Sequence, residues 1–365
     1  MAANYIWFIV AGTLVCGAAN SLFTKYQDNQ CVRDCDTDHP KLFEQPAIQT
    51  LQMFVGELSV IVVYWLVYTR NGNTDPHTKL TVFDNTRLSI PAICDLCATT
   101  LLNVGLVFTP VSIYQMTRGA LVLFVALLSV LFLKRRVTKL EWISLSLVTM
   151  GIALVGFAGS SNGKGQGFSG GVVFGIGLVV LATLVQSFQF VVEEQILSDH
   201  PVVPLQLVYC EGFYGSVIII ALMAILHVIM AMVLPPSQFL DSPFNIGESV
   251  SELVGNRNVL LSSVLIMISI AAFNYCGITL THKISATTRS TVDTCRTLLV
   301  WFCALAVGWE QFKWLQAVGF VVLVFGTLCY NKVLQPEQWN WVPSSLKEPV
   351  SLDPTNEYLE EREVL

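Results

Sequence analysis

Charged side chains are scarce in this chain of 365 residues. Asp, Glu, Lys and Arg together make up only 13% of it, whereas soluble domains carry about 25%. Hydrophobic residues account for 53%, and the mean hydropathy is +0.61. This composition excludes an ordinary soluble domain and places the chain among membrane proteins. The formal net charge is −6 and the sequence contains no basic patch, so we expect no nucleic-acid partner.

The motifs of common enzyme classes are missing as well. The sequence has no His-Glu-x-x-His, no Gly-x-Ser-x-Gly and no P-loop, and its five histidines are scattered. Asp95 and Asp293 could form the pair of an intramembrane aspartyl protease, but neither lies in the Gly-x-Gly-Asp setting of such enzymes. We therefore predict a protein that is not an enzyme and has no cofactor and no metal site.

The ten cysteines do not make a disulfide framework, because eight of them lie inside apolar stretches, where they serve as small packing residues. Cys31 and Cys35 differ, since they fall in a polar loop. The sequence allows either a disulfide between them or two free thiols. Cys94 and Cys97 have no second pair near them, which weakens a zinc interpretation.

Long apolar runs dominate the rest of the chain. Most approach the roughly 20 residues that an α-helix needs to cross about 30 Å of hydrocarbon, and in lipid such runs are helices. The sequence thus predicts an all-α membrane protein with ten transmembrane helices, near residues 5–24, 48–69, 88–108, 111–133, 140–158, 170–192, 204–234, 259–281, 284–307 and 312–333.

Two halves of the chain repeat one pattern. Trp142 lies 37 residues after Gly105, and Trp314 lies 37 residues after Gly277. Five helices in each half is an odd number, so the second half enters the membrane from the opposite side and a five-plus-five inverted repeat results. We predict a first repeat over residues 1–158, a linker over 159–169, a second repeat over 170–334 and a disordered acidic tail over 335–365.

Lysine and arginine are distributed unequally between the expected loops. With a cytosolic N-terminus, the cytosolic side holds eleven of these residues against six on the other side, with the densest cluster at Lys134-Arg135-Arg136. The positive-inside rule therefore predicts that both termini are cytosolic.

Two glutamates lie within apolar stretches at matching places in the two halves. Glu57 follows Gln52 by five residues, and Glu211 follows Gln206 by five. A carboxylate at bilayer depth costs about 2.5 kcal/mol or more. Two interpretations stay open for Glu57, a protonated carboxyl bonded to a neighbouring helix and a proton-coupling acid. We assign proton coupling to Glu57 and Glu211 as the functional hypothesis.

Other polar residues recur inside the apolar stretches. Asp95, Thr99 and Asn103 repeat every four residues and share one helix face. The predicted substrate-binding set, which would line a central cavity, consists of Asn20, Asp95, Thr99, Asn103, Gln115, Arg118, Gln189, Tyr214 and Arg289. Asp293 and Arg296 are spaced as i,i+3 neighbours, and we predict a structural ion pair between them.

A family resemblance rests on several specific strings, the longest of them near residue 290: Asn20-Ser-Leu-x-x-Lys25, Gly56-Glu57, Val192-Glu-Glu194, Glu211-Gly212, Phe273-Asn-x-x-Gly277-Ile, Ser285-Ala-Thr-Thr-Arg289, Asp293-x-x-Arg296-Thr, Gly308-Trp-Glu310 and Gly326-Thr-x-x-Tyr-Asn331. In these residues the chain resembles the drug/metabolite transporter superfamily and, within it, the F subfamily of solute carrier family 35. The resemblance covers about residues 5–333 and implies a transporter of an endomembrane compartment such as the vacuole, lysosome or Golgi.

We predict a secondary transporter that moves a small organic solute across an endomembrane by alternating access, coupled to protons or by exchange. The solute would be anionic or zwitterionic, resembling a nucleotide sugar or an amino acid or peptide. The expected partners are the lipid bilayer and this small-molecule substrate, and a homodimer stays open. A scaffold or receptor that kept the fold without transport is the alternative from another class.

Overall fold

A computed structural model describes residues 2–33, 35, 41–43, 45–70, 87–109, 114, 117–134, 138–160, 170–200, 202–235, 239, 245–308, 312–339 and 342–346. Within these ranges the chain is built from α-helices, and the strands are confined to one short antiparallel pair. The predicted linker, apart from its first residues, and the tail beyond Leu346 lie outside the described residues.

Each of the ten predicted apolar stretches contains an α-helix. The helices are α1 (Ala2–Asp28), α2 (Pro46–Tyr64), α4 (Ser89–Phe108), α6 (Leu121–Leu133), α7 (Lys139–Ser160), α8 (Gly170–Asp199), α9 (Pro204–Val233), α12 (Arg257–Lys283), α13 (Ala286–Val307) and α14 (Trp314–Tyr330). The last turn of α2 continues as a π-helix, η1 (Trp65–Arg70). The fourth helix is shorter than predicted, because Gly119 and Ala120 form a turn before Leu121.

Several of these helices begin with recognisable signals. α2 and α9 carry proline at the start, where its missing N–H costs no hydrogen bond. A capping box precedes α7: the Thr138 backbone N–H donates to Glu141 Oε2 at 2.8 Å, and the Glu141 N–H donates to Thr138 Oγ1 at 3.2 Å. Because such signals satisfy the end groups of a helix locally, they fix where these helices start.

Six helices are long and apolar enough to cross a membrane, judged by length and composition within the described residues. They span Asn4–Asp28, Pro46–Tyr68, Gly171–Asp199, Pro204–Val233, Arg257–Lys283 and Ala286–Val307. Shorter apolar helices lie at Ser89–Gly105, Leu121–Leu133 and Trp314–Tyr330. The chain is therefore a multi-pass, all-α membrane protein.

The exposure of side chains is reversed relative to that of a soluble protein. Phe8 is 72% exposed and Val321 69% exposed, while Glu57 and Glu193 are 1% and 0% exposed. Lipid tails accept large apolar side chains, but a polar group in hydrocarbon needs a partner inside the protein. The functional residues are therefore to be sought among the buried polar side chains.

The chain divides into two compact units. Unit 1 comprises Met1–Thr100, Val192–Ser285 and Arg296–Glu310, and unit 2 comprises Leu101–Val191, Ala286–Cys295 and Gln311–Leu365. α4, α8 and α13 contribute residues to both. This division mixes segments of the two predicted repeats, so it is not the repeat boundary.

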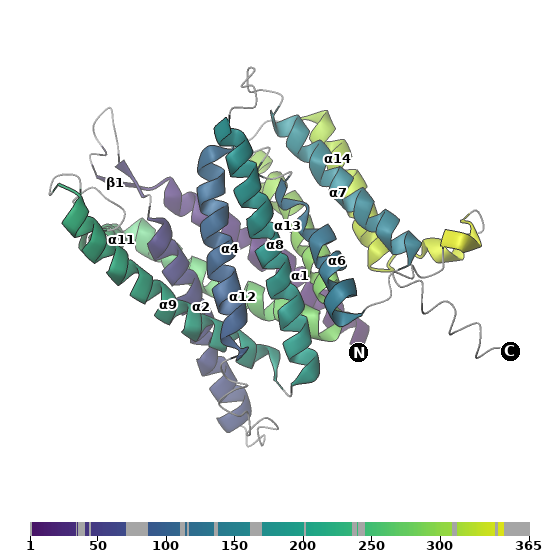
Figure 1. Ribbon diagram of the computed structural model, residues 1–365, viewed down its shortest axis with the longest axis horizontal. Helices are drawn as coiled ribbons and strands as arrows, with labels where there is room; N and C mark the ends of the chain where they lie inside the picture. The colour runs from purple at the N-terminus through teal and green to yellow at the C-terminus, as the bar shows by residue number, and fades with distance from the viewer. Residues whose placement is uncertain are drawn as a thin grey trace. The chain divides into compact units, whose positions relative to one another are not determined.

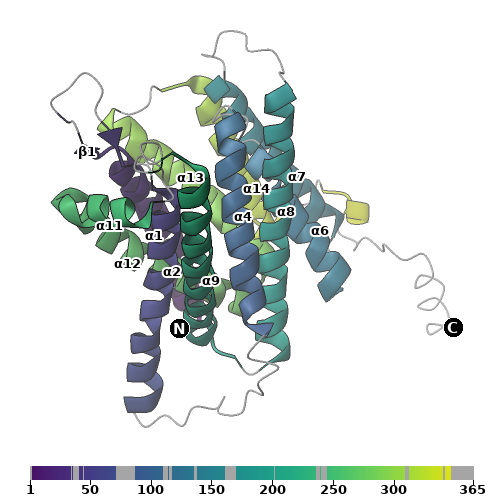
Figure 2. The same cartoon turned by 60° about the vertical axis from the view of Figure 1, so that its left-hand side comes forward.

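In unit 1, α1 packs along α12, and α2 packs along both α9 and α12; α2 and α9 run side by side in Figures 1 and 2. Two glycines allow these helices to approach closely. A Cβ atom on Gly56 would lie 2.5 Å from the backbone oxygen of Met267 in α12. One on Gly212 of α9 would clash with the backbone N–H of Leu58. Small residues at helix crossings are how membrane bundles pack their backbones together.

A disulfide-closed hairpin covers one end of unit 1. Strands β1 (Cys31–Arg33) and β2 (Lys41–Leu42) pair, and a disulfide joins Cys31 to Cys35, one of the two alternatives left open by the sequence. The hairpin contacts α11 (Ile246–Gly255), an amphipathic helix that we did not predict. Arg33 forms an ion pair with Glu248, and Lys41 Nζ lies 3.0 Å from Glu252 Oε1. The first loop is therefore fastened to a loop of the second half of the chain.

In unit 2, α7 packs along α14 and also contacts α6, and the α7–α14 pair is visible in Figure 1. The core between them includes Val122, Leu145 and Leu323, all of which are buried. After α14 the chain forms two 3-10 turns, η2 (Pro336–Gln338) and η3 (Ser344–Leu346). Both turns lie within the predicted tail, 335–365.

Candidate functional site

Glu57 is a deeply buried carboxyl group of unit 1. It lies eleven residues after the first residue of α2, and its side chain is 1% exposed. The side-chain amide of Asn274 in α12 donates a hydrogen bond from Nδ2 to Glu57 Oε1 at 2.5 Å. A buried carboxyl group requires such donors because it has lost its water. α12 thus supplies a neutral polar partner to the acid of α2.

Glu211 lies at the same helix crossing as Glu57. It is 4% exposed and precedes Gly212. A Cβ on Gly212 would lie 2.7 Å from the carbonyl carbon of Glu57, so the α9 backbone touches the α2 backbone beside both acids. The structure therefore places the backbones of the two matched glutamates at one helix crossing.

A buried glutamine accompanies each glutamate at the same spacing. Gln52 and Gln206 are 6% and 8% exposed. Among the residues that the structure describes, Gln52 Nε2 and Gln206 Oε1 have no hydrogen-bond partner. Buried amides of this kind are suited to hold water or a polar ligand.

Amide and hydroxyl groups connect α1, α2 and α12 near the hairpin. Gln27 is 0% exposed, and its Nε2 donates to Ser263 Oγ at 2.8 Å and to the Val259 carbonyl at 3.2 Å. Further along α1, Asn20 Oδ1 accepts a hydrogen bond from Ser269 at 3.3 Å. Asn20, a predicted substrate residue, therefore lies in a buried polar contact between α1 and α12.

Arg289 is a buried cation of unit 2. It is 3% exposed, and its guanidinium carbon lies 4.2 Å from the ring centroid of Phe190 in α8. Gln189 precedes Phe190 and is 4% exposed, and Asp293 is 7% exposed on the same helix as Arg289. A guanidinium stacked on an aromatic face still has N–H groups at its edge. This geometry suits recognition of an anionic group.

Arg296 has a different setting from Arg289. It is half-buried in unit 1, and its guanidinium carbon lies 5.1 Å from the ring centroid of Phe273 in α12. Its side-chain Cδ fills the space beside Gly17 of α1. The structure therefore gives Arg296 an aromatic partner, and the ion pair with Asp293 stays a prediction.

The remaining predicted substrate residues are spread over both units. On α4, Asp95 and Thr99 are half-buried in unit 1, while Asn103 is exposed and belongs to unit 2. Arg118 is half-buried in unit 2. Tyr214 is half-buried in unit 1, with its ring centroid 5.4 Å from that of Phe213. Gln115 lies outside the described residues.

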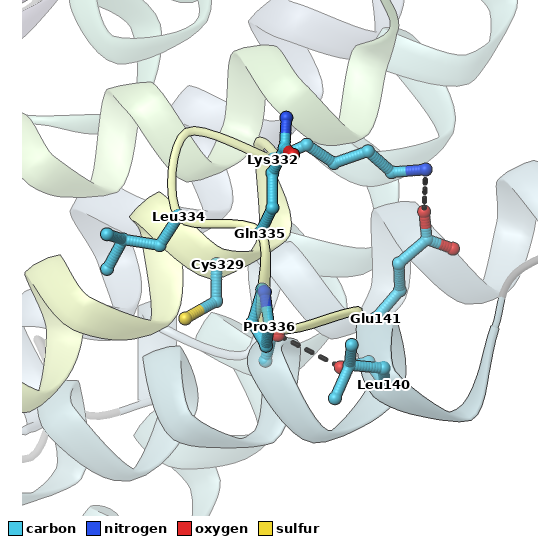
Figure 3. Close-up of a pocket in the computed structure, with 8 residues that line it drawn as sticks. Leu140, Glu141, Cys329, Lys332, Leu334, Gln335 and Pro336 are labelled. Carbon is cyan, nitrogen blue, oxygen red and sulfur yellow. Dashed lines mark hydrogen bonds and ion pairs between the residues drawn. The ribbon is translucent and has the colours of Figure 1, made fainter. Parts of the chain in front are cut away.

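A small cavity lies in unit 2 where α7 begins and α14 ends. Its volume is about 160 Å³, and Figure 3 shows the side chains that line it. Lys332 Nζ lies 3.5 Å from Glu141 Oε1 at its rim. None of the predicted substrate residues lines this cavity, so it is not the predicted central site.

Sequence reasoning missed Asn274 and Gln27 as site residues. Both are uncharged amides, and the search for functional residues gave most weight to charge. The signal that could have found Asn274 is its place in Phe273-Asn-x-x-Gly277, one of the strings that carry the family resemblance. Among the described residues no group of three or more His, Cys, Asp or Glu side chains could hold a metal ion.

Comparison with known proteins gives a family for this architecture. The sequence model of the nucleotide-sugar transporter family matches residues 47–232. The chain is 34% identical over 343 residues to solute carrier family 35 member F6 of Rattus norvegicus, covering 91% of this chain and 90% of that protein. It is 30% identical over 158 residues to a UDP-galactose transporter of Schizosaccharomyces pombe, covering 40% of this chain and 44% of that protein.

A solved crystal structure shares the fold. Its TM-score is 0.64 at 13% sequence identity, and the similarity covers 92% of this chain and 99% of the other. Sequence and fold thus agree with the apolar helices and buried polar residues described above. The chain belongs to the nucleotide-sugar transporter family, in the F subfamily of solute carrier family 35, and it is a membrane transporter of solutes and not an enzyme.

Proposed function

We propose that this protein moves a small anionic or zwitterionic organic solute across an endomembrane by alternating access, and that Glu57 and Glu211 couple the movement to protons. The observation that carries the proposal is the α2–α9 crossing, where both buried glutamates lie beside backbone contact. Carboxyl groups at bilayer depth mark proton and substrate routes in transporters.

Helix pairing supports an inverted repeat of five-plus-five helices. α2 and α9 are the second helices of the two predicted repeats and pack together, and α7 and α14 are the fifth helices and do the same. In unit 1, α1 packs on α12. α1 is the first helix of the first repeat, and α12 is the third helix of the second repeat. The reciprocal pair is α8 with α4, where a Cβ on Gly105 would lie 2.7 Å from Val179. Such reciprocal pairing is what a pseudo-two-fold axis in the membrane plane requires.

The hairpin supports the predicted orientation. The loop that holds Cys31 and Cys35 and the loop that holds α11 both fall on the non-cytosolic side if the termini are cytosolic, and the two loops contact each other. A disulfide in one of them fits an oxidising lumen. Labelling of introduced cysteines from the cytosol should modify residues 70–87 and the tail but not residues 28–44; modification of all three from one side would overturn this topology.

The substrate class follows from the cations and from the family. A guanidinium such as that of Arg289 binds phosphate or carboxylate groups, as recognition of a nucleotide sugar or an amino acid would require. We favour a nucleotide-sugar-like solute, because the family model and one relative name that class. Thermal stabilisation of the purified protein by UDP-sugars, with amino acids and dipeptides as comparison, tests this choice. Stabilisation by amino acids or dipeptides alone would contradict it.

A further inference from the structure

Two helices fix the place of Glu57 independently of its own side chain. Gly56 holds the α2 backbone against Met267 of α12, and Gly212 holds it against α9. Because these contacts involve backbone atoms, the packing of the helices fixes the position of the Glu57 backbone. Asn274, on the same helix as Met267, then reaches the carboxyl group with a hydrogen bond of 2.5 Å.

The chemistry of an amide suits a carboxyl group that gains and loses a proton. An ionised carboxylate only accepts hydrogen bonds, whereas a protonated carboxyl group also donates one. An asparagine side chain carries N–H donors and a carbonyl acceptor, so a rotation of the amide lets it serve either state. A lysine or arginine in this place would hold the carboxylate ionised.

Charged residues on the helices packed against α2 can also act on Glu57. α9 carries Glu211, whose neighbour Gly212 lies against the Glu57 backbone. α12 has no charged residue between Arg257 at its start and Lys283 at its end, apart from His282, which can also carry charge. On the α13 segment of unit 1 the cation is Arg296, which lies over Phe273, the neighbour of Asn274. The group with a described hydrogen bond to Glu57 is thus an uncharged one.

We propose that Asn274 is the positioning residue of Glu57: it can hydrogen-bond the carboxyl group in both protonation states, but its N–H holds the carboxylate more strongly, and this difference sets the pH at which Glu57 binds a proton. The inference rests on the proposed function, because it assigns Glu57 to proton coupling. It adds a residue that acts on this site through Glu57 and does not touch the solute. The neighbouring residue of α12, Phe273, contacts the guanidinium of Arg296.

The test reads the proton on Glu57 directly. Infrared difference spectra of the full-length protein in lipid nanodiscs, titrated from acidic to alkaline pH, should show the C=O band of a protonated carboxyl group. Loss of that band in Glu57→Gln assigns it. In Asn274→Leu the donor to the carboxylate is gone, so the midpoint of the band should move to higher pH by about one unit, a tenfold change in proton affinity.

Two further variants control for misfolding. Asn274→Gln retains an amide and should leave the midpoint nearer to the wild-type value than Asn274→Leu does. Asn274→Asp places a second carboxyl group against Glu57, so the pair should retain a proton to higher pH than wild type. Asn258→Leu, at the exposed start of α12, is the matched control and should not move the midpoint.

An unchanged midpoint in both Asn274→Leu and Asn274→Asp would overturn the inference, as would a pH range without any protonated Glu57. The infrared measurement requires no solute. If the midpoints move as expected but no solute is transported, the role of Asn274 is supported and the proposed function is wrong. If transport is proton-coupled but the midpoints do not move, the proposed function is supported and the role of Asn274 is wrong.

Discussion

Gly212 of α9 lies against the backbone of Glu57 in α2, where a Cβ atom would be only 2.7 Å from the Glu57 carbonyl carbon. This contact explains why an acid can be buried here: the helix positions are set by backbone against backbone, and the side chain of Glu57 reaches Asn274. Helix packing and the polar contact of Glu57 thus occur at the same crossing, and substitutions can perturb one without the other.

Substitution at the crossing should destabilise the protein. Gly212→Ala adds a methyl group against the Leu58 N–H, which the backbone cannot avoid without moving. We expect a loss of about 1–3 kcal/mol in the free energy of unfolding, measured as a lower melting temperature of the purified protein. Gly177→Ala in α8 is the matched control, because a Cβ there meets nothing within 4 Å. Equal melting of the two variants would show that the close approach is not needed.

The disulfide should stabilise the hairpin that covers one end of unit 1. Cys31 and Cys35 are four residues apart in sequence, and closing so short a loop is worth about 2 kcal/mol in the chain-entropy model. Cys31→Ser should therefore have a lower melting temperature than wild type, and a reductant should lower the melting temperature of wild type to that of the variant. Cys97→Ser, which removes an exposed free thiol, should not change melting. If the reductant leaves wild type unaffected, the hairpin is held without the disulfide.

The two acids of α11 should differ in their importance. Glu252 is 5% exposed, pairs with Lys41 and accepts a hydrogen bond from Gln45 Nε2 at 2.9 Å. Glu252→Ala leaves both partners without an acceptor, which should cost about 2–3 kcal/mol of stability. Glu248 pairs with the more exposed Arg33, so Glu248→Ala should cost no more than about 1 kcal/mol. Chemical denaturation or thermal melting compares the stability of the two variants. A larger loss in Glu248→Ala than in Glu252→Ala would contradict the burial argument.

Arg289 and Asp293 should have separate roles. Arg289 lies over Phe190, and we assign it to solute binding, so Arg289→Ala should fold normally but transport poorly. Asp293 is 7% exposed, and if it holds Arg296 its removal breaks a buried pair, at a cost of about 3–5 kcal/mol. We expect Asp293→Ala to express and melt less well than Arg289→Ala. An unfolded Arg289→Ala beside a stable, inactive Asp293→Ala would show that the roles are reversed.

The sequence predicted the helices well because lipid leaves few alternatives. Apolar runs of this length must be helical, and each predicted run contains a helix. Side-chain bonding of hydroxyls was also foreseeable: Ser21 and Ser187 donate to carbonyls four residues earlier, as hydroxyls in membrane helices usually do. The backbones of Glu57 and Glu211 lie at one helix crossing, in keeping with their matched positions in the sequence.

Other features could not be read from the pattern. α11 is short and half polar, and its buried residues Ser249 and Glu252 face a hairpin that is distant in sequence. Hydropathy does not detect a helix that buries its polar side. Asn274 was missed for a related reason, since an uncharged amide shows its importance only when the acid it contacts is known.

The most direct test of the central claim is uptake by proteoliposomes, measured over a range of external pH with a solute identified by thermal stabilisation. We expect wild-type uptake to depend on pH, and Glu57→Gln and Glu211→Gln to lose this dependence while retaining part of the solute exchange. Glu248→Gln on α11, away from the helix crossing, should keep the wild-type profile. Uptake whose pH dependence is unchanged in both Glu57→Gln and Glu211→Gln would contradict the account.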